Sequence, residues 1–301
     1  VEQRLREVRL DNLMDSGYLR PFLESGPFSL FSGTGVTERP DTLCAKVSEG
    51  RIAILVDGSP YAILLPCLFS ENFQSMDDYA ERPYYAVFIR LIKYLAFFLT
   101  ILLPGCYVAA VNFHPELIPD QLLFRIAEAE QGMAFPLMFQ ALLIHFIYEL
   151  MREAGLRLPR PVGHAVSIIG ALVIGDAAVT AGLISTPMVM VVALTTISSF
   201  VIPSLYEPVT LLRLLFILLG GTLGLYGVVL GLAFVGVNLC SVTVLGVPAT
   251  SPETPLSLYS LRDTLIRVGW RQLGQEQFII SRTAGADQNG EPADQNGEGQ
   301  P

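Results

Sequence analysis

Charged side chains are scarce in this sequence. Aspartate, glutamate, lysine and arginine make up only 16% of its 301 residues, and the mean hydropathy is +0.50. The charges between residues 84 and 248 are grouped between long apolar runs, whereas a water-soluble domain would scatter them. Because a helix needs about 17 to 25 mostly apolar residues to cross a hydrocarbon core, this region is predicted to be an α-helical polytopic membrane protein.

The sequence also lacks the motifs of common enzymes. It has no phosphate-binding loop, no dinucleotide fingerprint and no cluster with metal-ligand spacing. Its four cysteines lie far apart, which is typical of free buried thiols: Cys44, Cys67, Cys106 and Cys240. We therefore expect no catalytic residue, no cofactor and no metal site.

Two other catalytic arrangements are disfavoured. An intramembrane aspartyl protease needs a second aspartate to share a proton with Asp176, and the apolar runs contain none. His164 and Ser185 stand at opposite ends of one apolar run, about 30 Å apart by helical rise, so they cannot form a nucleophile and base pair on that helix. The protein is not expected to be an enzyme.

The net charge of −9 lies mainly in the two flanks of the apolar region, residues 1–83 and 249–301. This acidity argues against a nucleic-acid partner. The sequence begins with Val1 in the middle of a helical pattern and shows no secretion signal. We expect an N-terminal soluble part that is incomplete.

The soluble part contains a predicted helix over residues 38–50. Asp41 or Thr42 is expected near its N-cap, and Gly50 lies just past its end, where glycine commonly terminates a helix.

A predicted hairpin follows this helix. Residues 51–56 and 61–65 are rich in branched apolar side chains, and the turn between them carries Asp57-Gly58. Because both strands are almost continuously apolar, both faces of each are expected to be covered, with the missing N-terminal residues supplying the cover. Residues 1–83 are therefore interpreted as the C-terminal part of an α/β domain.

The apolar region, residues 84–248, predicts four to six membrane spans. Basic residues flank the start of the first span and the end of the second, so the N-terminal domain is expected in the cytoplasm. The acidic, amphipathic segment 119–129 is expected outside, in the membrane interface. The first four spans are expected at residues 89–112, 133–151, 162–181 and 188–206.

The last apolar run, residues 211–247, is too long for one crossing and barely long enough for two. Arg262, Arg267 and Arg271 follow it and favour a cytoplasmic tail, which requires an even number of crossings. The run therefore crosses twice or enters and returns, and a single steeply tilted span is the alternative. Residues 249–301 are predicted to be a cytoplasmic tail, disordered at its end.

Asp176 is the first candidate functional residue. An ionised acid near the bilayer centre costs about 2.5 to 3.5 kcal/mol, so something must compensate. Asp176 and Thr180 share a helix face and could line a water-filled path or make an interhelical contact. A protonated acid, or one near the outer surface, remains the alternative.

The second predicted span carries a polar stripe. His145, Tyr148, Glu149 and Arg152 fall on one helix face. Such a face avoids lipid and turns toward a partner helix or a pore. The alternative is a pair, Glu149 and Arg152, that reaches the membrane interface.

Four glycines recur at intervals of four, three and four residues in the last apolar run. This spacing predicts a seam at which helix backbones approach closely, in an oligomer or subunit contact. The residues are Gly220, Gly224, Gly227 and Gly231.

Several longer motifs occur together. They are TERPD at 37–41, EGRIAILVDGSPYAILLP at 49–66, MDDY at 76–79, RLIKYLAFFLTILLPGCYVAAVNFHPELIP at 90–119, REAGLRLP at 152–159 and IGDAAVTAGLIS at 174–185. With these motifs in combination, the sequence resembles the A-type subunit of the spore germinant receptors over about residues 1–269. This subunit defines the GerA family of spore germination proteins. In that family the cytoplasmic N-terminal region is longer, which implies that this chain is N-terminally truncated.

The resemblance implies a membrane subunit of a nutrient receptor in the spore inner membrane, with its N-terminal domain in the cytoplasm. The implied partners are a transporter-like B subunit, a lipoprotein C subunit and further copies of the chain. The implied homo-oligomer, a pentamer, would be a nutrient-gated ion channel that triggers germination. It would lie in the lipid bilayer and bind no nucleic acid.

The sequence departs from the family pattern at positions that bear on an ion path. Gln140 and His145 stand where acids are usual, and Asp176 stands where glutamine is usual. We expect Gln140, His145, Glu149, Asp176 and Thr180 to face an ion path or a subunit contact. Two other functions stay open: a secondary transporter or permease, although no internal repeat is found among the spans, and a non-conducting scaffold.

Overall fold

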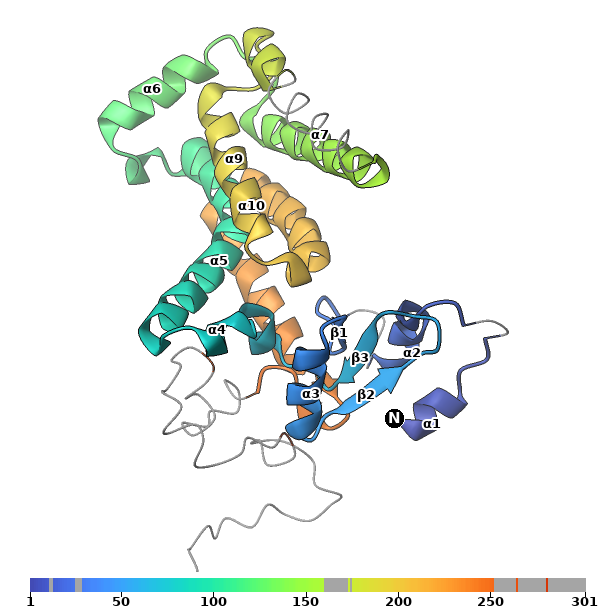
Figure 1. Ribbon diagram of the computed structural model, residues 1–301. Coiled ribbons are helices and arrows are strands. Elements are labelled where there is room, and N and C mark those ends of the chain that lie inside the picture. Colours follow the sequence, from blue (N-terminus) through green and yellow to red (C-terminus); the bar gives the residue numbers. More distant parts are fainter. Residues whose placement is uncertain are drawn as a thin grey trace, which may run out of the picture. The chain divides into compact units, whose positions relative to one another are not determined.

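The computed structural model describes residues 1–10, 13–24, 29–159, 173, 175–251, 264 and 280. The chain forms two compact units. The first, here called the sheet unit, comprises Val1–Ile92 and Val235–Pro301, and the second, the helical unit, comprises Lys93–Phe234. Figure 1 labels the helices and strands in chain order.

The sheet unit opens with short helices and then a three-stranded antiparallel sheet. Its strands lie in the order β1-β3-β2. Before α5 its elements are α1 (Glu2–Arg6), η1 (Ser16–Leu19), α2 (Arg20–Leu23), β1 (Gly35–Thr37), α3 (Pro40–Ser48), β2 (Ile52–Leu55), β3 (Ala62–Leu65), η2 (Phe69–Phe73) and α4 (Asp77–Ala80).

The predicted hairpin is confirmed as β2 and β3. Ile52 pairs with Leu65 and Leu55 pairs with Ala62. Gly58 in the connecting turn has a φ of +83°, a conformation that favours glycine. The sequence analysis missed β1, which pairs with the other edge of β3, because three residues carry too little pattern to be recognised.

Within this chain β3 is covered and β2 is partly exposed, so the cover expected from N-terminal residues outside this sequence remains a prediction for β2. All four residues of β3 are buried, whereas Ile52 and Leu55 of β2 are 45% and 71% exposed. The difference follows from strand order, since β3 is central and β2 is an edge strand.

The predicted helix at 38–50 is confirmed as α3, with Asp41 and Thr42 near its N-cap as expected. Arg39 occupies the N-cap and Pro40 the first helical turn, where its missing N–H is not needed. Asp41 lies inside the first turn and binds Arg39 at 2.8 Å. Gly50 follows the helix with a φ of +84°, as expected for a glycine terminator.

A buried ion cluster joins α3, the start of β2 and η2. Arg51 is 5% exposed, pairs with Glu71 and Glu49, and donates to the Pro66 carbonyl at 2.8 Å. Lys46 lies 3.3 Å from Glu71. Burial alone would raise the pKa of the Glu71 carboxyl, but Lys46 and Arg51 lower it below its usual value. Glu71 is therefore ionised at neutral pH.

The chain returns to the sheet unit after α10. A short hairpin of β4 (Thr243–Val244) and β5 (Val247–Pro248) follows that helix. The Phe69 amide donates to the Ala249 carbonyl at 2.8 Å. The core of the unit combines residues from both ends of the chain, namely Leu19, Leu23, Ile63, Leu65, Val242, Val244 and Ala249.

Further contacts hold the two chain segments in this unit together. Arg90, at the start of α5 (Pro83–Phe113), is fully buried, pairs with Asp78 at 3.2 Å and donates to the Thr264 carbonyl at 3.2 Å. The Ile280 amide donates to the Glu49 carbonyl at 2.9 Å. The segments before α5 and after α10 thus belong to one compact unit.

The helical unit contains most of α5 and four further helices among its described residues. These are α6 (Asp120–Glu130), α7 (Leu137–Arg157), α9 (Thr186–Phe200) and the greater part of α10 (Tyr206–Ser241), with the short turns η3 (Pro115–Leu117) and η4 (Pro203–Leu205). The predicted first, second and fourth spans correspond to α5, α7 and α9. Most of the third, residues 162–181, lies outside the described residues.

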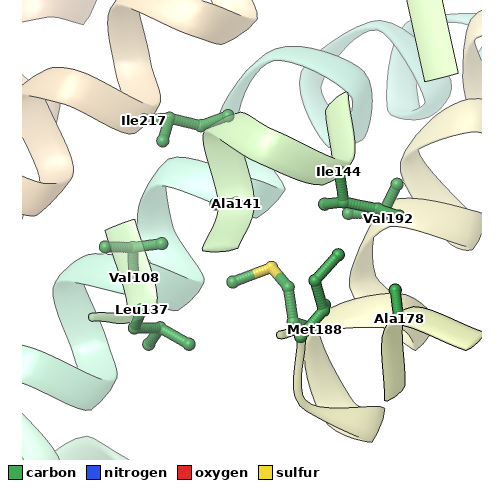
Figure 2. Packing of buried hydrophobic residues seen from close by; sticks show 9 residues of the cluster. Val108, Leu137, Ala141, Ile144, Ala178, Met188, Val192 and Ile217 are labelled. Atoms are coloured by element: carbon green, nitrogen blue, oxygen red, sulfur yellow. The ribbon is translucent and has the colours of Figure 1, made fainter. Parts of the chain in front are cut away.

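Two described helices are long and apolar enough to cross a membrane. They are α5 and the segment Pro203–Ser241, and α9 is a shorter apolar helix. The predicted count of four to six spans remains a prediction. An apolar core joins α5, α7, α9 and α10 inside the unit (Figure 2), with Val108, Ala141, Met188 and Ile217 from the four helices.

The segment α10 is two helices that meet at Gly224. This residue has a φ of +65° and a ψ of −152°, which is not helical. A Cβ added to Gly227 would lie 2.5 Å from the Leu219 carbonyl oxygen, and one added to Gly231 would lie 3.0 Å from the Phe216 ring. In a straight helix Gly227 would lie about 12 Å from Leu219 along the axis, and Gly231 would lie about 22 Å from Phe216.

The chain therefore reverses at Gly224, and the two halves of α10 pack antiparallel. Each half is about 26 Å long by helical rise, close to the thickness of about 30 Å of a hydrocarbon core. Two antiparallel halves do not have the shape of a single tilted span, the alternative left open by the sequence, and the number of crossings of this segment remains a prediction. A run that crosses twice, or enters and returns, is compatible with the fold.

The first half of α10 touches α5 through two glycines. A Cβ on Gly105 would lie 2.5 Å from the Phe216 carbonyl oxygen, and a Cβ on Gly220 would overlap the Gly105 carbonyl oxygen. The two backbones are in contact, an approach that small residues permit between apolar helices. Pro104 lies within α5, and the helix continues through it.

Substitution of Gly220 by alanine should destabilise the helical unit by about 1 to 3 kcal/mol, because the added methyl group must push α5 and α10 apart. Thermal unfolding of the detergent-purified protein measures this. Gly236→Ala is the matched control, since a Cβ there meets no atom within 4 Å. Equal destabilisation by the two substitutions would contradict the backbone contact.

Glu71→Gln should destabilise the sheet unit by about 3 kcal/mol at pH 7, because it leaves Arg51 and Lys46 buried without their carboxylate. The folded pKa of Glu71 is lowered from 4.5, so its contribution is complete above pH 4.5 and is lost as the pH falls further. The native and variant unfolding temperatures should therefore converge on acidification. Asp77→Asn, which removes a 73% exposed acid, should show little effect at any pH.

Candidate functional site

The polar stripe of α7 lies against α10 of the same chain. Glu149 is central to this contact, since its Oε1 accepts from Arg213 Nη2 at 2.7 Å. The Tyr206 hydroxyl donates to the same carboxylate at 2.6 to 2.7 Å. Arg213 is fully buried, whereas the Glu149 side chain is 25% exposed. The ion pair and the tyrosine thus tie α7 to the first half of α10.

Arg152 extends this cluster by stacking. Its guanidinium carbon lies 3.3 Å from the centre of the Tyr206 ring, which is a close cation–π contact. Within the described residues, Arg152 and Glu149 form no ion pair with each other, and their placement at a membrane interface remains the alternative to a subunit contact. The cluster Glu149, Arg152, Tyr206 and Arg213 contains two guanidinium groups and one carboxylate.

Gln140 and His145 are both fully buried on α7. Gln140 donates to Glu130 at 2.7 Å and to the Phe135 carbonyl at 2.9 Å, and it accepts from the Ser185 amide at 2.8 Å. It therefore joins the end of α6 and the start of α9. His145 Nδ1 lies 2.8 Å from the Ala141 carbonyl oxygen of its own helix. Neither residue is exposed on the surface of the unit.

Asp176 and Thr180 differ from the other candidates because both are exposed. They lie in a helical stretch that runs to residue 180, one turn apart. Within the described residues, neither makes a hydrogen bond or ion pair. Ala178, on the opposite side of this stretch, belongs to the apolar core (Figure 2). The Asp176 and Thr180 face is therefore directed away from that core.

The four glycines of the predicted seam do not lie along one helix face. Gly220 contacts α5, Gly224 forms the reversal beside Phe113, and Gly227 and Gly231 contact the first half of α10. The break at Gly224 is the reason, since spacing defines a common face only in a continuous helix. All four contacts are within the chain.

Sequence reasoning missed the roles of Arg213 and Tyr206. Arg213 is the only lysine or arginine between Arg160 and Arg262. The free-energy cost of placing a charged side chain in a bilayer, which made Asp176 a candidate, applies equally to an arginine within an apolar run. The sequence therefore contained a signal for Arg213. Tyr206 had no such signal, because tyrosine is common at the ends of apolar helices.

The described side chains of the site form ion pairs and hydrogen bonds that hold helices together. Within the described residues, no three side chains of histidine, cysteine, aspartate or glutamate are placed to hold a metal ion. The Glu149 carboxylate is already neutralised by Arg213 and bound by Tyr206. Among the candidate residues, Asp176 is the acid that is exposed and open to another chain or to water.

The chain is similar to spore germination proteins over nearly its whole length. Residues 1–277 match the family described as Bacillus/Clostridium GerA spore germination protein. Spore germination protein KA of Bacillus subtilis is 43% identical over 299 residues, which cover 97% of this chain and 55% of that protein. Spore germination protein B1 of the same organism is 39% identical over 270 residues, covering 89% and 56%.

A third relative is described only as an uncharacterized membrane protein, YfkQ of Bacillus subtilis. It is 37% identical over 287 residues, covering 95% of this chain and 56% of that protein. No solved structure matches the chain. The chain spans about half the length of the curated relatives it matches. On this identity and coverage, the chain belongs to the GerA family of Bacillus and Clostridium spore germination proteins.

Proposed function

We propose that this chain is the membrane part of an A-type subunit of a spore germinant receptor, and that it oligomerises into a nutrient-gated ion channel. Family membership supports a role in spore germination. The partners in this proposal are a transporter-like B subunit and a lipoprotein C subunit. The location is the spore inner membrane, with the sheet unit in the cytoplasm.

Asp176 carries the channel part of the proposal. It is an exposed acid in an apolar helical unit, and it has no partner among the described residues. An ionised carboxylate facing lipid would cost about 2.5 to 3.5 kcal/mol, so contact with a second copy or with a water-filled path is the favourable alternative. Thr180 extends the same polar face by one turn and would serve the same contact.

The other candidates have a different role in this proposal. The carboxylate of Glu149 is occupied by Arg213 and Tyr206, and Gln140 and His145 are fully buried. Their contacts hold α7 against α6, α9 and α10 of the same chain. We therefore assign the ion path or subunit contact to the face of Asp176 and Thr180, and the fixing of α7 to the other three residues.

Asp176→Asn should slow nutrient-triggered cation release from spores roughly tenfold, because a change of about 1.4 kcal/mol in an ion's free energy changes a rate tenfold. The same variant should alter the oligomeric state of the purified protein if the carboxylate contacts a second copy. Both measurements are needed, because a role in the ion path changes cation release, whereas a contact with a second copy changes the oligomeric state.

Glu153→Gln is the matched control, since Glu153 is 57% exposed on α7 and pairs only with Arg157 of the same helix among described residues. It should leave release and oligomeric state unchanged. The proposed role of Asp176 is wrong if Asp176→Asn, present at the native level in spores, alters neither measurement.

A further inference from the structure

Arg90 is a fully buried arginine that joins three segments of the chain at the start of α5. Its Nε donates to Asp78 Oδ2 at 3.2 Å, and its Nη1 donates to the Thr264 carbonyl at 3.2 Å. The centre of the Tyr79 ring lies 5.7 Å from its guanidinium carbon, within cation–π range. Asp78, Arg90 and Thr264 are here called the Arg90 clamp. Because a buried guanidinium that loses a partner is strongly destabilising, the start of α5 is held in place while the clamp is intact.

Both partners of Arg90 in the clamp are themselves buried. Asp78 is 4% exposed, and its Oδ2 also accepts from the Ser75 amide at 3.0 Å. Thr264 is 3% exposed. A guanidinium is planar and its donors point in fixed directions, so it binds the carboxylate and the carbonyl together only in one arrangement. A shift of the C-terminal tail at Thr264 therefore has to be matched by a shift at Arg90.

The C-terminal tail has a second contact with the sheet unit, at Ile280. This residue is 4% exposed and packs against Leu68 and Val247. Its amide donates to the carbonyl of Glu49, at the end of α3, at 2.9 Å. Burial of the isoleucine side chain stabilises this contact. Ile280 therefore helps to keep Thr264 beside Arg90.

The helix α5 extends the effect of the clamp beyond the sheet unit. It is one helix that belongs to the sheet unit up to Ile92 and to the helical unit from Lys93. Arg90 lies less than one turn before this boundary. The helix is also one of the two described segments that are long and apolar enough to cross a membrane. A change in the tail that reaches Arg90 therefore reaches the helix that connects the two units.

We propose that the Arg90 clamp couples the C-terminal tail to α5, so that displacement of the tail loosens the first turns of this helix. The coupling is reciprocal, because the effect of one site on another equals the reverse effect in free energy. A partner that binds and displaces the tail thus acts on α5 without touching the helical unit. This coupling does not depend on the proposed channel.

Hydrogen exchange of the detergent-purified full chain, measured by mass spectrometry, tests the coupling in both directions. Arg90→Lys keeps the buried charge beside Asp78 but lacks the planar fork that also reaches the Thr264 carbonyl. It should speed exchange at Ile280 roughly tenfold, although the described contacts of Ile280 are with other residues. Ile280→Ser should speed exchange in the first turns of α5, before Lys93, by a similar factor.

The double variant separates coupling from two independent losses of stability. Once Arg90→Lys has opened the clamp, adding Ile280→Ser should not speed exchange in α5 further, since both changes act through one contact. Leu55→Ser is the matched control, because it makes a similar change at a 71% exposed position of β2. It should leave exchange at Ile280 and in α5 unchanged. Slow exchange in β3 shows that the sheet is folded, and Ile280→Val makes a smaller change of the same kind if Ile280→Ser unfolds it.

Three results would overturn the coupling. In the first, Arg90→Lys speeds exchange in α5 and leaves Ile280 unchanged, so that Arg90 acts only on its own helix. In the second, the effects of the two substitutions on α5 add in the double variant. In the third, Ile280→Val speeds exchange in β3 as much as in α5. None of these results bears on the role in germination, which is tested in spores.

Discussion

The reversal of the chain at Gly224 is the constraint on which the rest of the structure depends. Only glycine adopts its combination of φ and ψ without strain. The reversal turns one apolar run into two antiparallel helices. After the second of them, Val242 and Val244 join the core of the sheet unit with Ile63 and Leu65. The even number of crossings remains a prediction from the arginines of the tail, and a chain that reverses at Gly224 is compatible with it.

Glycine also determines how closely the helices pack. The backbones of α5 and α10 touch at Gly105 and Gly220, and the two halves of α10 touch at Gly227 and Gly231. Apolar side chains gain little by associating in lipid, so close van der Waals packing has to hold these helices together. This packing places Arg213 against α7, where Glu149 neutralises it.

The polar residues of the helical unit divide into two groups on physical grounds. Glu149, Gln140 and Arg213 have partners inside the chain, and each contact joins one helix to another. Asp176 and Thr180 have none in the described part and are exposed. An inward polar group stabilises the fold of one chain, whereas an outward one in an apolar unit requires something from outside the chain. This division is the basis for assigning assembly or conduction to Asp176.

Much of the fold was predictable because its signals are local. The Asp57-Gly58 turn and its flanking apolar runs predicted β2 and β3, and Gly50 predicted the end of α3. Exposure of Leu55 was not predictable, because strand order depends on β1, which pairs through residues far away in the sequence. The spacing of the glycines predicted close packing of helices but not which helices pack. A regular spacing defines one face only in a continuous helix, and this helix is interrupted at Gly224. The role of Arg213 was not predictable, because its contact with Glu149 depends on how α10 folds.

The return of the chain to one side of the membrane is tested most directly by cysteine accessibility. Single cysteines replace the exposed residues Asp57, Glu116 and Thr243 in a protein without its native cysteines, and an impermeant maleimide is applied to each side of sealed vesicles. The account predicts that positions 57 and 243 react from the same side and position 116 from the opposite side. Reaction of positions 57 and 243 from opposite sides would contradict it.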